Sequence, residues 1–267
     1  MIKVRKPRFE FPDDIPFWFN PKNRDASLIA NHLSLMAPAF ERYFIKAIRD
    51  AMPRIRDAEA KEEANRFCLQ EGQHARLHIE HQNLLLRKHP ALEAVRDEVN
   101  RSYDDLYRNE STDFALAYAT TIELAFKPVA KFLVENRRIF FADGDPRIAA
   151  FVLWHFVEEF EHRHAMFDVY QEVVGDYWYR LKVGRRTRAH VNELTSLVRK
   201  ACIESEEPPA TDPALPRVPR MRTLALVLGL LETRSPFHDP RRGRVPQWIT
   251  DWFAADEAGQ DMTTVAL

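Results

Sequence analysis

The sequence predicts an all-α protein: a bundle of four long helices with one long crossover, an extended N-terminal arm and additional C-terminal helices. Three observations predict this class. Only 7 of the 267 residues are glycine, and apolar residues rarely alternate as they do in strands. Four long segments instead repeat apolar residues at the helical period. Hydrophobic residues make up 45% of the chain, which is enough for a sizeable core.

The first 24 residues are rich in proline and aromatic residues and lack a helical period, as FEFPDDIPFWFNP shows. A disordered leader would seldom carry so many aromatic side chains. We therefore expect residues 1–24 to form an extended arm that packs its aromatic rings onto the body. These rings belong to Phe11, Phe17, Trp18 and Phe19.

Two long helices should follow the arm. The first begins near residue 25, where Asp25 and Ser27 are good caps, and ends near residue 50. Pro38 should kink or restart it. The second covers about residues 57–88, and a shorter helix is expected over 91–108.

The third and fourth long helices lie further along the chain. The third covers about residues 111–136, with Pro128 as a kink. The sequence DGDP at 143–146 is typical of a turn. The fourth helix begins at the proline of that turn and continues to about residue 174, where Gly175 suits its end.

The C-terminal third has a different composition. A polar helix is expected over 185–204, a proline-rich linker over 206–220, and a short apolar helix over 221–233. An aromatic tail closes the chain. We therefore predict three parts: the arm 1–24, a helical bundle 25–205, and a linker, helix and tail 206–267 packed on the bundle.

Composition also limits the function. The formal net charge is -1, so the chain lacks the excess of positive charge that is typical of proteins that bind nucleic acid or an anionic membrane. The apolar run 224–231 is far shorter than the ~20 residues of a membrane span. The basic N-terminus has no apolar run of a signal peptide after it. Cys68 and Cys202 are expected to be reduced thiols, so a cytoplasmic protein is predicted.

The stretch WHFVEEFEHRHAMFD (154–168) places acids and imidazoles among large apolar residues. At about 100° per residue, Glu159 lies roughly 40° and His162 roughly 340° from His155 around the helix. These three side chains therefore share one stripe. Ionised groups in an apolar helix are expected to be paired or to bind a metal.

The second helix carries a similar motif. Glu71 and His74 lie three residues apart on one face, and His78 follows one turn later. The first and third helices each place a single carboxylate, Glu41 and Glu123, in an apolar stripe. One buried glutamate would cost several kcal/mol or become protonated, so two of them indicate a shared cation.

The complete pattern is Glu, Glu-x-x-His, Glu, Glu-x-x-His on four successive helices, which is the ligand set of di-iron and di-manganese carboxylate bundles. The intervals fit this arrangement. Thirty residues separate the first two glutamates and 36 the last two, as in antiparallel hairpins. The 52 residues between Glu71 and Glu123 suit the long crossover. The predicted metal ligands are Glu41, Glu71, His74, Glu123, His155, Glu159 and His162.

The register within the fourth helix has alternatives. Glu161 with His164, and Glu158 with His162, also have ligand spacing. We prefer Glu159 with His162 because both share the stripe of His155. The remaining three side chains are then interpreted as partners of the ligands or as a solvated face.

Several other polar residues have more than one interpretation. His155 is either a ligand or a core histidine, and His78 is more often a partner of the ligands than a ligand. His81 is expected at the surface. Lys127 follows Glu123 by one turn and is expected to extend outward. Cys68 is interpreted as a packing residue.

The seven predicted ligands resemble those of the ferritin-like non-haem di-iron oxygenases. His155, one turn before Glu159, is similar to the third histidine of the branch represented by p-aminobenzoate N-oxygenase. The phrases QEGQHARLH and HFVEEFEHRHAMFD also resemble a bacterial group labelled predicted metal-dependent hydrolases. The resemblance covers about residues 25–175, and it implies a ferritin-like fold.

This resemblance implies a non-haem di-iron monooxygenase with two iron ions, which uses O₂ to hydroxylate or N-oxidise a small organic substrate. A carboxylic acid or an acyl thioester is within the expected class. A ferredoxin or reductase would supply two electrons. The alternatives are a binuclear metal-dependent hydrolase acting on an ester, amide or phosphate, and an iron-storing bundle. A homodimer is a further expectation, from the aromatic residues at both termini.

Overall fold

The computed structural model describes residues 2–264, and within them the regular elements are helices and not strands. The all-α, ferritin-like prediction is thereby confirmed. The longer helices are α1 (Arg24–Ala51), α2 (Ala58–Lys88), α3 (Leu92–Asn109), α4 (Thr112–Glu135), α6 (Pro146–Glu161) and α8 (Tyr177–Ser205). The shorter ones are η1 (Met52–Arg54), α5 (Arg137–Phe141), α7 (Ala165–Val173), α9 (Arg220–Glu232) and α10 (Gln247–Glu257).

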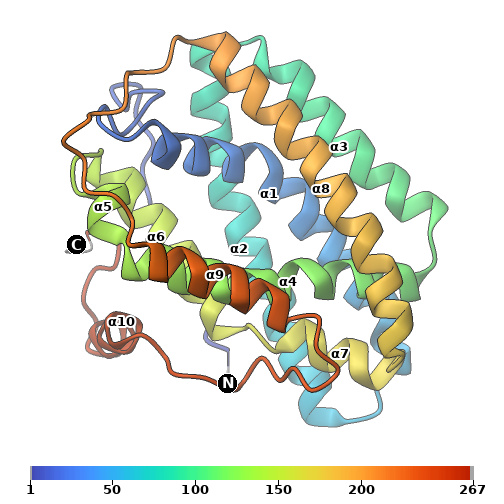
Figure 1. Ribbon diagram of the computed structural model, residues 1–267. Helices are drawn as coiled ribbons and strands as arrows, with labels where there is room; N and C mark the ends of the chain where they lie inside the picture. Colours follow the sequence, from blue (N-terminus) through green and yellow to red (C-terminus); the bar gives the residue numbers. More distant parts are fainter. Residues whose placement is uncertain (1, 265–267) are drawn as a thin grey trace.

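Two helical pairs form the bundle (Figure 1). Helices α1 and α2 pack along each other, and α4 packs against α6 and α7. Contacts between α1 and α4 join the two pairs. Helix α3 lies within the crossover from α2 to α4, and α8 covers α1, α3 and α4 on one side.

The helix starts follow local capping chemistry. The side chains of Asp57, Ser111 and Asp145 each accept a hydrogen bond from a backbone N–H in the first turn that follows. The cap of α1 differs from the prediction. Asn23 fills this position, accepting from the Ala26 N–H at 3.1 Å while its amide donates to the Ile139 carbonyl, a tertiary contact.

Helix α1 continues through Pro38, so of the two predicted effects of this proline the restart is excluded and the kink stays a prediction. Other predicted boundaries were wrong. The predicted fourth helix breaks after Glu161 and resumes as α7, and at the break Arg163 donates to the Phe160 carbonyl at 2.6 Å. Helix α8 starts at Tyr177, earlier than expected, while α5 and α10 were not predicted.

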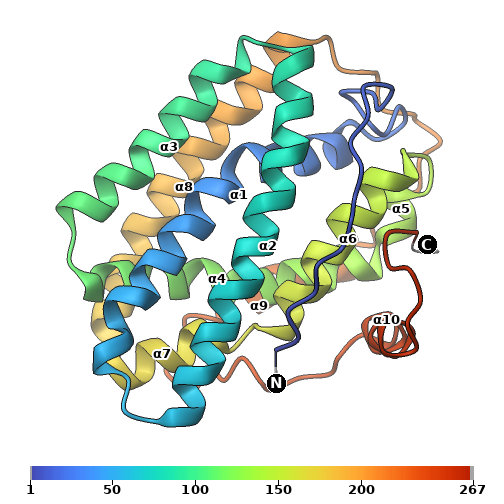
Figure 2. The ribbon, with the colours of Figure 1, turned by 180° about the vertical axis from the view of Figure 1, so that it is seen from behind.

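The N-terminal arm lies along α2 and α6 (Figure 2). The Lys3 carbonyl accepts from Gln70 of α2 at 3.1 Å. The ring centre of Phe9 lies 5.4 Å from that of Phe151 on α6. The predicted packing of the arm is confirmed, since the rings of Phe17, Trp18 and Phe19 are buried and that of Phe11 is partly buried.

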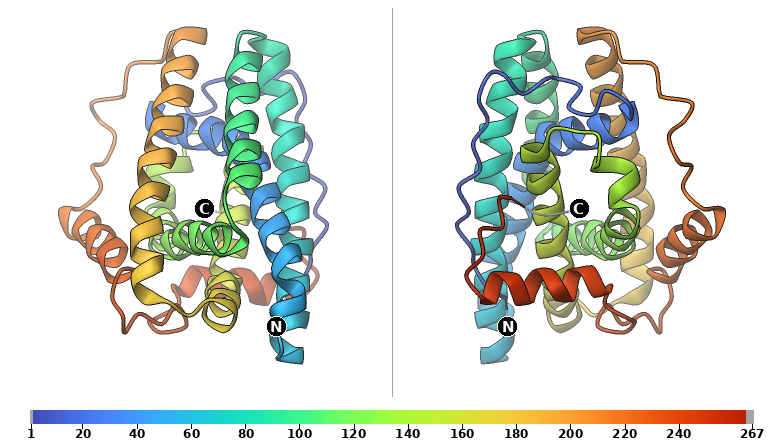
Figure 3. Two further views of the ribbon diagram at one scale, coloured as in Figure 1. Left: turned by 90° about the vertical axis from the view of Figure 1, so that its right-hand side faces the viewer. Right: turned by 90° about the vertical axis from the view of Figure 1, so that its left-hand side faces the viewer.

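The C-terminal segments border the same bundle (Figure 3). Helix α9 packs on α4, and α10 reaches the N-terminal arm, where the Trp252 ring lies 5.3 Å from the Arg5 guanidinium. Among the described residues, each helix is too short or too polar to cross a membrane.

Candidate metal centre

The seven predicted ligands meet in the core of the bundle. They come from α1, α2, α4 and α6, and the last of them directly follows α6. Each is at most 1% exposed. The set comprises Glu41, Glu71, His74, Glu123, His155, Glu159 and His162.

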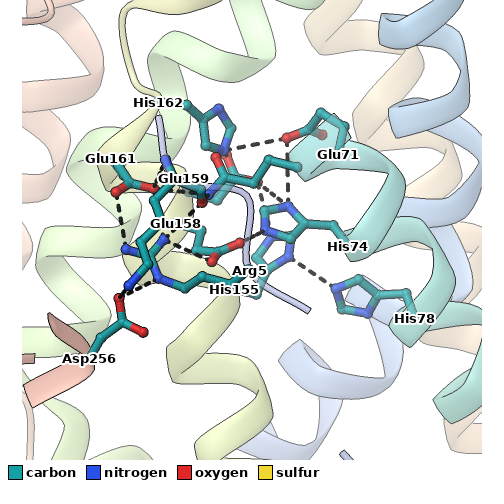
Figure 4. A network of polar contacts seen from close by, with 12 residues as sticks. Arg5, Glu71, His74, His78, His155, Glu158, Glu159, Glu161, His162 and Asp256 are labelled. Carbon is teal, nitrogen blue, oxygen red and sulfur yellow. Dashed lines mark hydrogen bonds and ion pairs between the residues drawn. The ribbon is translucent and has the colours of Figure 1, made fainter. Parts of the chain in front are cut away.

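One group of donor atoms brings together Glu71, His74, Glu159 and His162 (Figure 4). Ligand atoms from these four residues lie within 4.8 Å of one another. The Glu71 Oε1 atom is 3.6 Å from His74 Nδ1 and 3.4 Å from His162 Nε2. Glu159 faces the same two rings, at 3.5 Å each. The two Glu-x-x-His motifs therefore face each other, as one metal ion between them would require.

A second group lies beside the first and consists of Glu41, His78 and His155, again with donor atoms within 4.8 Å. Glu159 links the groups, since its Oε1 atom lies 3.3 Å from His155 Nε2. The structure places His78 in this group, although the sequence favoured a role outside the ligands. The only signal was its position one turn after His74.

Glu123 joins the centre at its other end. Its Oε2 atom lies 3.4 Å from His162 Nδ1. His162 is the residue at which α6 ends, with φ -94° and ψ 10°. The helix break therefore sets the direction of the His162 ring, which faces Glu71, Glu123 and Glu159 at once.

The hydrogen bonds of these residues test whether metal ions fit. Among the described residues, both carboxylate oxygens of Glu41, Glu71, Glu123 and Glu159 are buried without a hydrogen-bond partner. The same holds for Nδ1 of His74, Nε2 of His155 and both ring nitrogens of His162. Buried polar groups are rarely left unsatisfied. Two divalent cations would ligate these atoms and balance the four carboxylate charges.

The electrostatics agree with this fit. Burial, and then repulsion from Glu159, raises the pKa of Glu123 to about 8. Burial and Glu71 raise the pKa of Glu41 well above its ordinary value. Without metal, burial therefore favours the protonated form of these two carboxyl groups. Glu159 is the exception: burial raises its pKa, but the rings of His162, His74 and His155 together lower it overall.

A chain of polar contacts fixes the ring of His74. Its Nε2 atom lies 3.0 Å from Glu158 Oε2, and the other Glu158 oxygen accepts from the Arg5 guanidinium at 3.0 Å. Arg5 also donates to Glu161 and Asp256. Because Nε2 carries the proton toward Glu158, Nδ1 is free to face the candidate metal position. The N-terminal arm and α10 thereby support the centre (Figure 4).

A second chain supports His155. Its Nδ1 atom lies 3.1 Å from His78 Nε2, and His78 Nδ1 lies 2.9 Å from the Ser34 hydroxyl. The same hydroxyl contacts His81 Nδ1 at 2.7 Å. The prediction that His81 lies at the surface was wrong, because Ser34 and the Phe11 ring of the arm enclose it.

Of the alternative registers of the fourth helix, Glu161 with His164 does not reach the centre, and Glu158 contacts the outer nitrogen of His74. Glu161 pairs with Arg5, and His164 pairs with Asp168 at 3.0 Å, both in partly exposed positions. Lys127 does not pair with Glu123 either. It is half-buried and donates to the Arg242 carbonyl.

Aromatic rings surround the imidazoles. The Phe67 ring centre lies 4.9 Å from His162, the Trp154 ring 4.9 Å from His74, and the Phe151 ring 4.6 Å from His78. This apolar surrounding limits the access of water to the donor atoms.

One family of proteins matches the chain. The family model described as predicted metal-dependent hydrolase matches residues 3–239, so the chain belongs to this family. The family description indicates a metal-dependent enzyme, and it does not confirm the resemblance to di-iron oxygenases. Comparisons with curated proteins and with solved structures gave no match.

Proposed function

We propose that this member of the predicted metal-dependent hydrolase family is a non-haem di-iron monooxygenase. The observation that supports the proposal is the pair of adjacent donor groups from α1, α2 and α6, with Glu123 of α4 beside His162. Their carboxylate oxygens are unpartnered and buried among aromatic rings. Mixed carboxylate and imidazole donors favour iron, manganese or zinc over magnesium and calcium. The proposed ligands are Glu41, Glu71, His74, Glu123, His155, Glu159 and His162, and His78 supports His155 through a hydrogen bond.

When bound and reduced, the iron pair supplies the two-electron activation of O₂ that inserts one oxygen atom into a C–H bond or an amine. The second oxygen atom leaves as water, so two electrons and two protons come from outside. A ferredoxin or a reductase is the proposed electron donor.

The side chains of this protein have separate tasks around the ions. Glu158 holds the proton on Nε2 of His74 and thereby keeps Nδ1 available. Glu159 lies between the two donor groups and would help to hold the metal in either of them. The aromatic rings exclude water, which would otherwise compete with an apolar substrate.

Metal content gives the first test of this proposal. His162→Gln should lose bound iron, whereas His164→Gln, two residues later but paired with Asp168, should retain it. We expect two irons per chain in the original protein, measured by mass spectrometry of the metals. Equal iron loss in both variants, or one zinc per chain, would contradict the proposed centre.

Oxygen consumption gives the second test. Reduced, iron-loaded protein should consume O₂ when mixed with it, and His162→Gln protein should not. Protein that holds two irons but leaves O₂ unchanged under reducing conditions would exclude the oxygenase.

The family description favours a second candidate, a binuclear metal-dependent hydrolase. In that case the ions supply an activated water molecule that attacks an ester, amide or phosphate. Hydrolysis by zinc-loaded protein under anaerobic conditions would establish this candidate over the oxygenase.

A further inference from the structure

A pocket of about 580 Å³ lies between α4 and α9, outside the metal centre. Its floor includes Pro128 and Phe132 of α4, and its other side includes Leu226 of α9. The two helices touch at Gly229, where an added Cβ would lie 2.9 Å from Pro128 Cβ. The two helices are therefore in close contact at Gly229, and the pocket lies beside this contact.

The pocket carries an excess of positive charge. Five of its lining residues are lysine or arginine, and two are glutamate. Among the described residues, Arg244 forms no ion pair and no side-chain hydrogen bond, although it lines the pocket. Lys127 is half-buried in the wall, where its ammonium group donates to the Arg242 carbonyl and keeps two N–H groups for a ligand, and burial lowers its pKa. An unpaired guanidinium and a partly desolvated ammonium group favour an anionic ligand.

His238 gives an independent indication of a polar ligand. It lines the pocket and is 8% exposed, and neither ring nitrogen has a hydrogen-bond partner among the described residues. The nearest acid, Glu232, lies 3.6 Å from Nδ1, beyond hydrogen-bond length. A buried imidazole with both nitrogens unsatisfied is expected to bond to something that enters the pocket.

The pocket borders the elements that carry the metal centre. Lys127 follows Glu123 by one turn of α4, and Phe160 of the pocket wall directly follows Glu159 on α6. The remaining wall is largely apolar, formed by side chains of α4 and α9. A molecule with a charged head and an apolar body fits this combination of walls.

We propose that this pocket binds an organic anion, a carboxylate or phosphate monoester with an apolar chain, through Lys127, Arg244 and His238. The binding itself stands on the pocket alone. The further step, that this anion is the substrate of the adjacent centre, rests on the proposed function.

Calorimetry on the purified full-length protein tests the binding, with laurate and dodecyl phosphate as probes. At least one probe should bind with a stoichiometry of one. Dodecanol, which lacks the charge, and acetate, which lacks the chain, should bind at least about tenfold more weakly, since a charged hydrogen bond and a buried chain each contribute that much. Equal binding of dodecanol and both anions, or no binding of either anion, would overturn the proposal.

A second pocket supplies the matched control. It lies between α1 and α8, and its lining combines apolar side chains with polar ones that include Arg199 and Asp25. Arg244→Gln should weaken anion binding about tenfold, the effect of one charged contact, whereas Arg199→Gln should leave it unchanged. His238→Phe, which keeps an aromatic ring, should also weaken it. If Arg199→Gln weakens binding and Arg244→Gln does not, the proposed pocket is wrong.

The two proposals can fail separately. Anion binding in a protein that neither consumes O₂ nor hydrolyses esters would retain the pocket and reject the proposed function. Activity without anion binding would retain the function and reject the pocket.

Discussion

Replacing Glu158 by glutamine tests the support of the metal centre. The change keeps the shape of the side chain and removes its charge, so His74 Nε2 still has an oxygen acceptor at about the same place. Arg5 keeps its contacts to Glu161 at 2.9 Å and Asp256 at 2.8 Å, so the fold should persist. What is lost is the charge that makes His74 a stronger donor to a cation.

The expected size of this effect follows from the contact. Loss of a hydrogen-bonded carboxylate behind a metal-binding histidine typically weakens metal affinity about 10- to 100-fold. Because each factor of ten corresponds to about 1.4 kcal/mol, the expected loss in binding free energy is about 1.4–2.8 kcal/mol. Competition of the protein with a chromogenic chelator for zinc or Fe(II) measures this loss.

Glu161→Gln is the matched control for this prediction. It also removes one carboxylate charge from Arg5, but Glu161 does not contact His74. Metal affinity should then change by less than about threefold, the size of a weak long-range charge effect. Equal losses of metal affinity in the two variants, or an unchanged affinity in Glu158→Gln, would refute the proposed role of Glu158.

Three further predictions concern stability. Without metal, the folded chain holds a proton on Glu123, whose pKa is about 8 when folded and 4.5 when unfolded. The stability of the fold should therefore fall as the pH rises from 4.5 to 8. Thermal melting of chelator-treated protein measures this fall, and added metal ion should reduce it. Gly144→Ala should destabilise the fold by about 1–3 kcal/mol, because the added Cβ would lie 2.7 Å from the Phe19 ring. Gly72→Ala, at an open helical position, is the control and should not destabilise it. Denaturant unfolding of the two variants measures the difference. Phe9→Ala should lower the free energy of unfolding by about 3–5 kcal/mol in the same assay, since the ring is buried against two aromatic rings of α6. A loss below about 1 kcal/mol would mean that the arm contributes little to stability.

Local sequence patterns were sufficient for the long helices. Apolar spacing and polar caps such as Asp57 and Ser111 act within one or two turns, so they can be recognised without the rest of the chain. The failures occurred where distant groups decide. Asn23 caps α1 while its amide bonds to a carbonyl more than 100 residues away. Arg163, at the break after α6, donates to the distant carbonyl of Pro240.

The candidate site shows the same division. The spacing of Glu71 with His74, and of Glu159 with His162, indicated paired ligands, because residues three apart share a helix face. Whether a neighbouring side chain joins them depends on the helix opposite. His78 meets His155, and His81 meets Ser34, through contacts across the bundle that no single helix reveals.

By itself, the sequence determined that four helices carry acids and imidazoles on their apolar faces, because helical periodicity is a local property. The tertiary structure alone decided how those faces meet. It placed Arg5 and α10 behind His74 and brought His78 beside His155, and it formed the basic pocket under α9. Such contacts depend on how distant segments pack against one another, and the residue pattern of a single helix does not determine that packing.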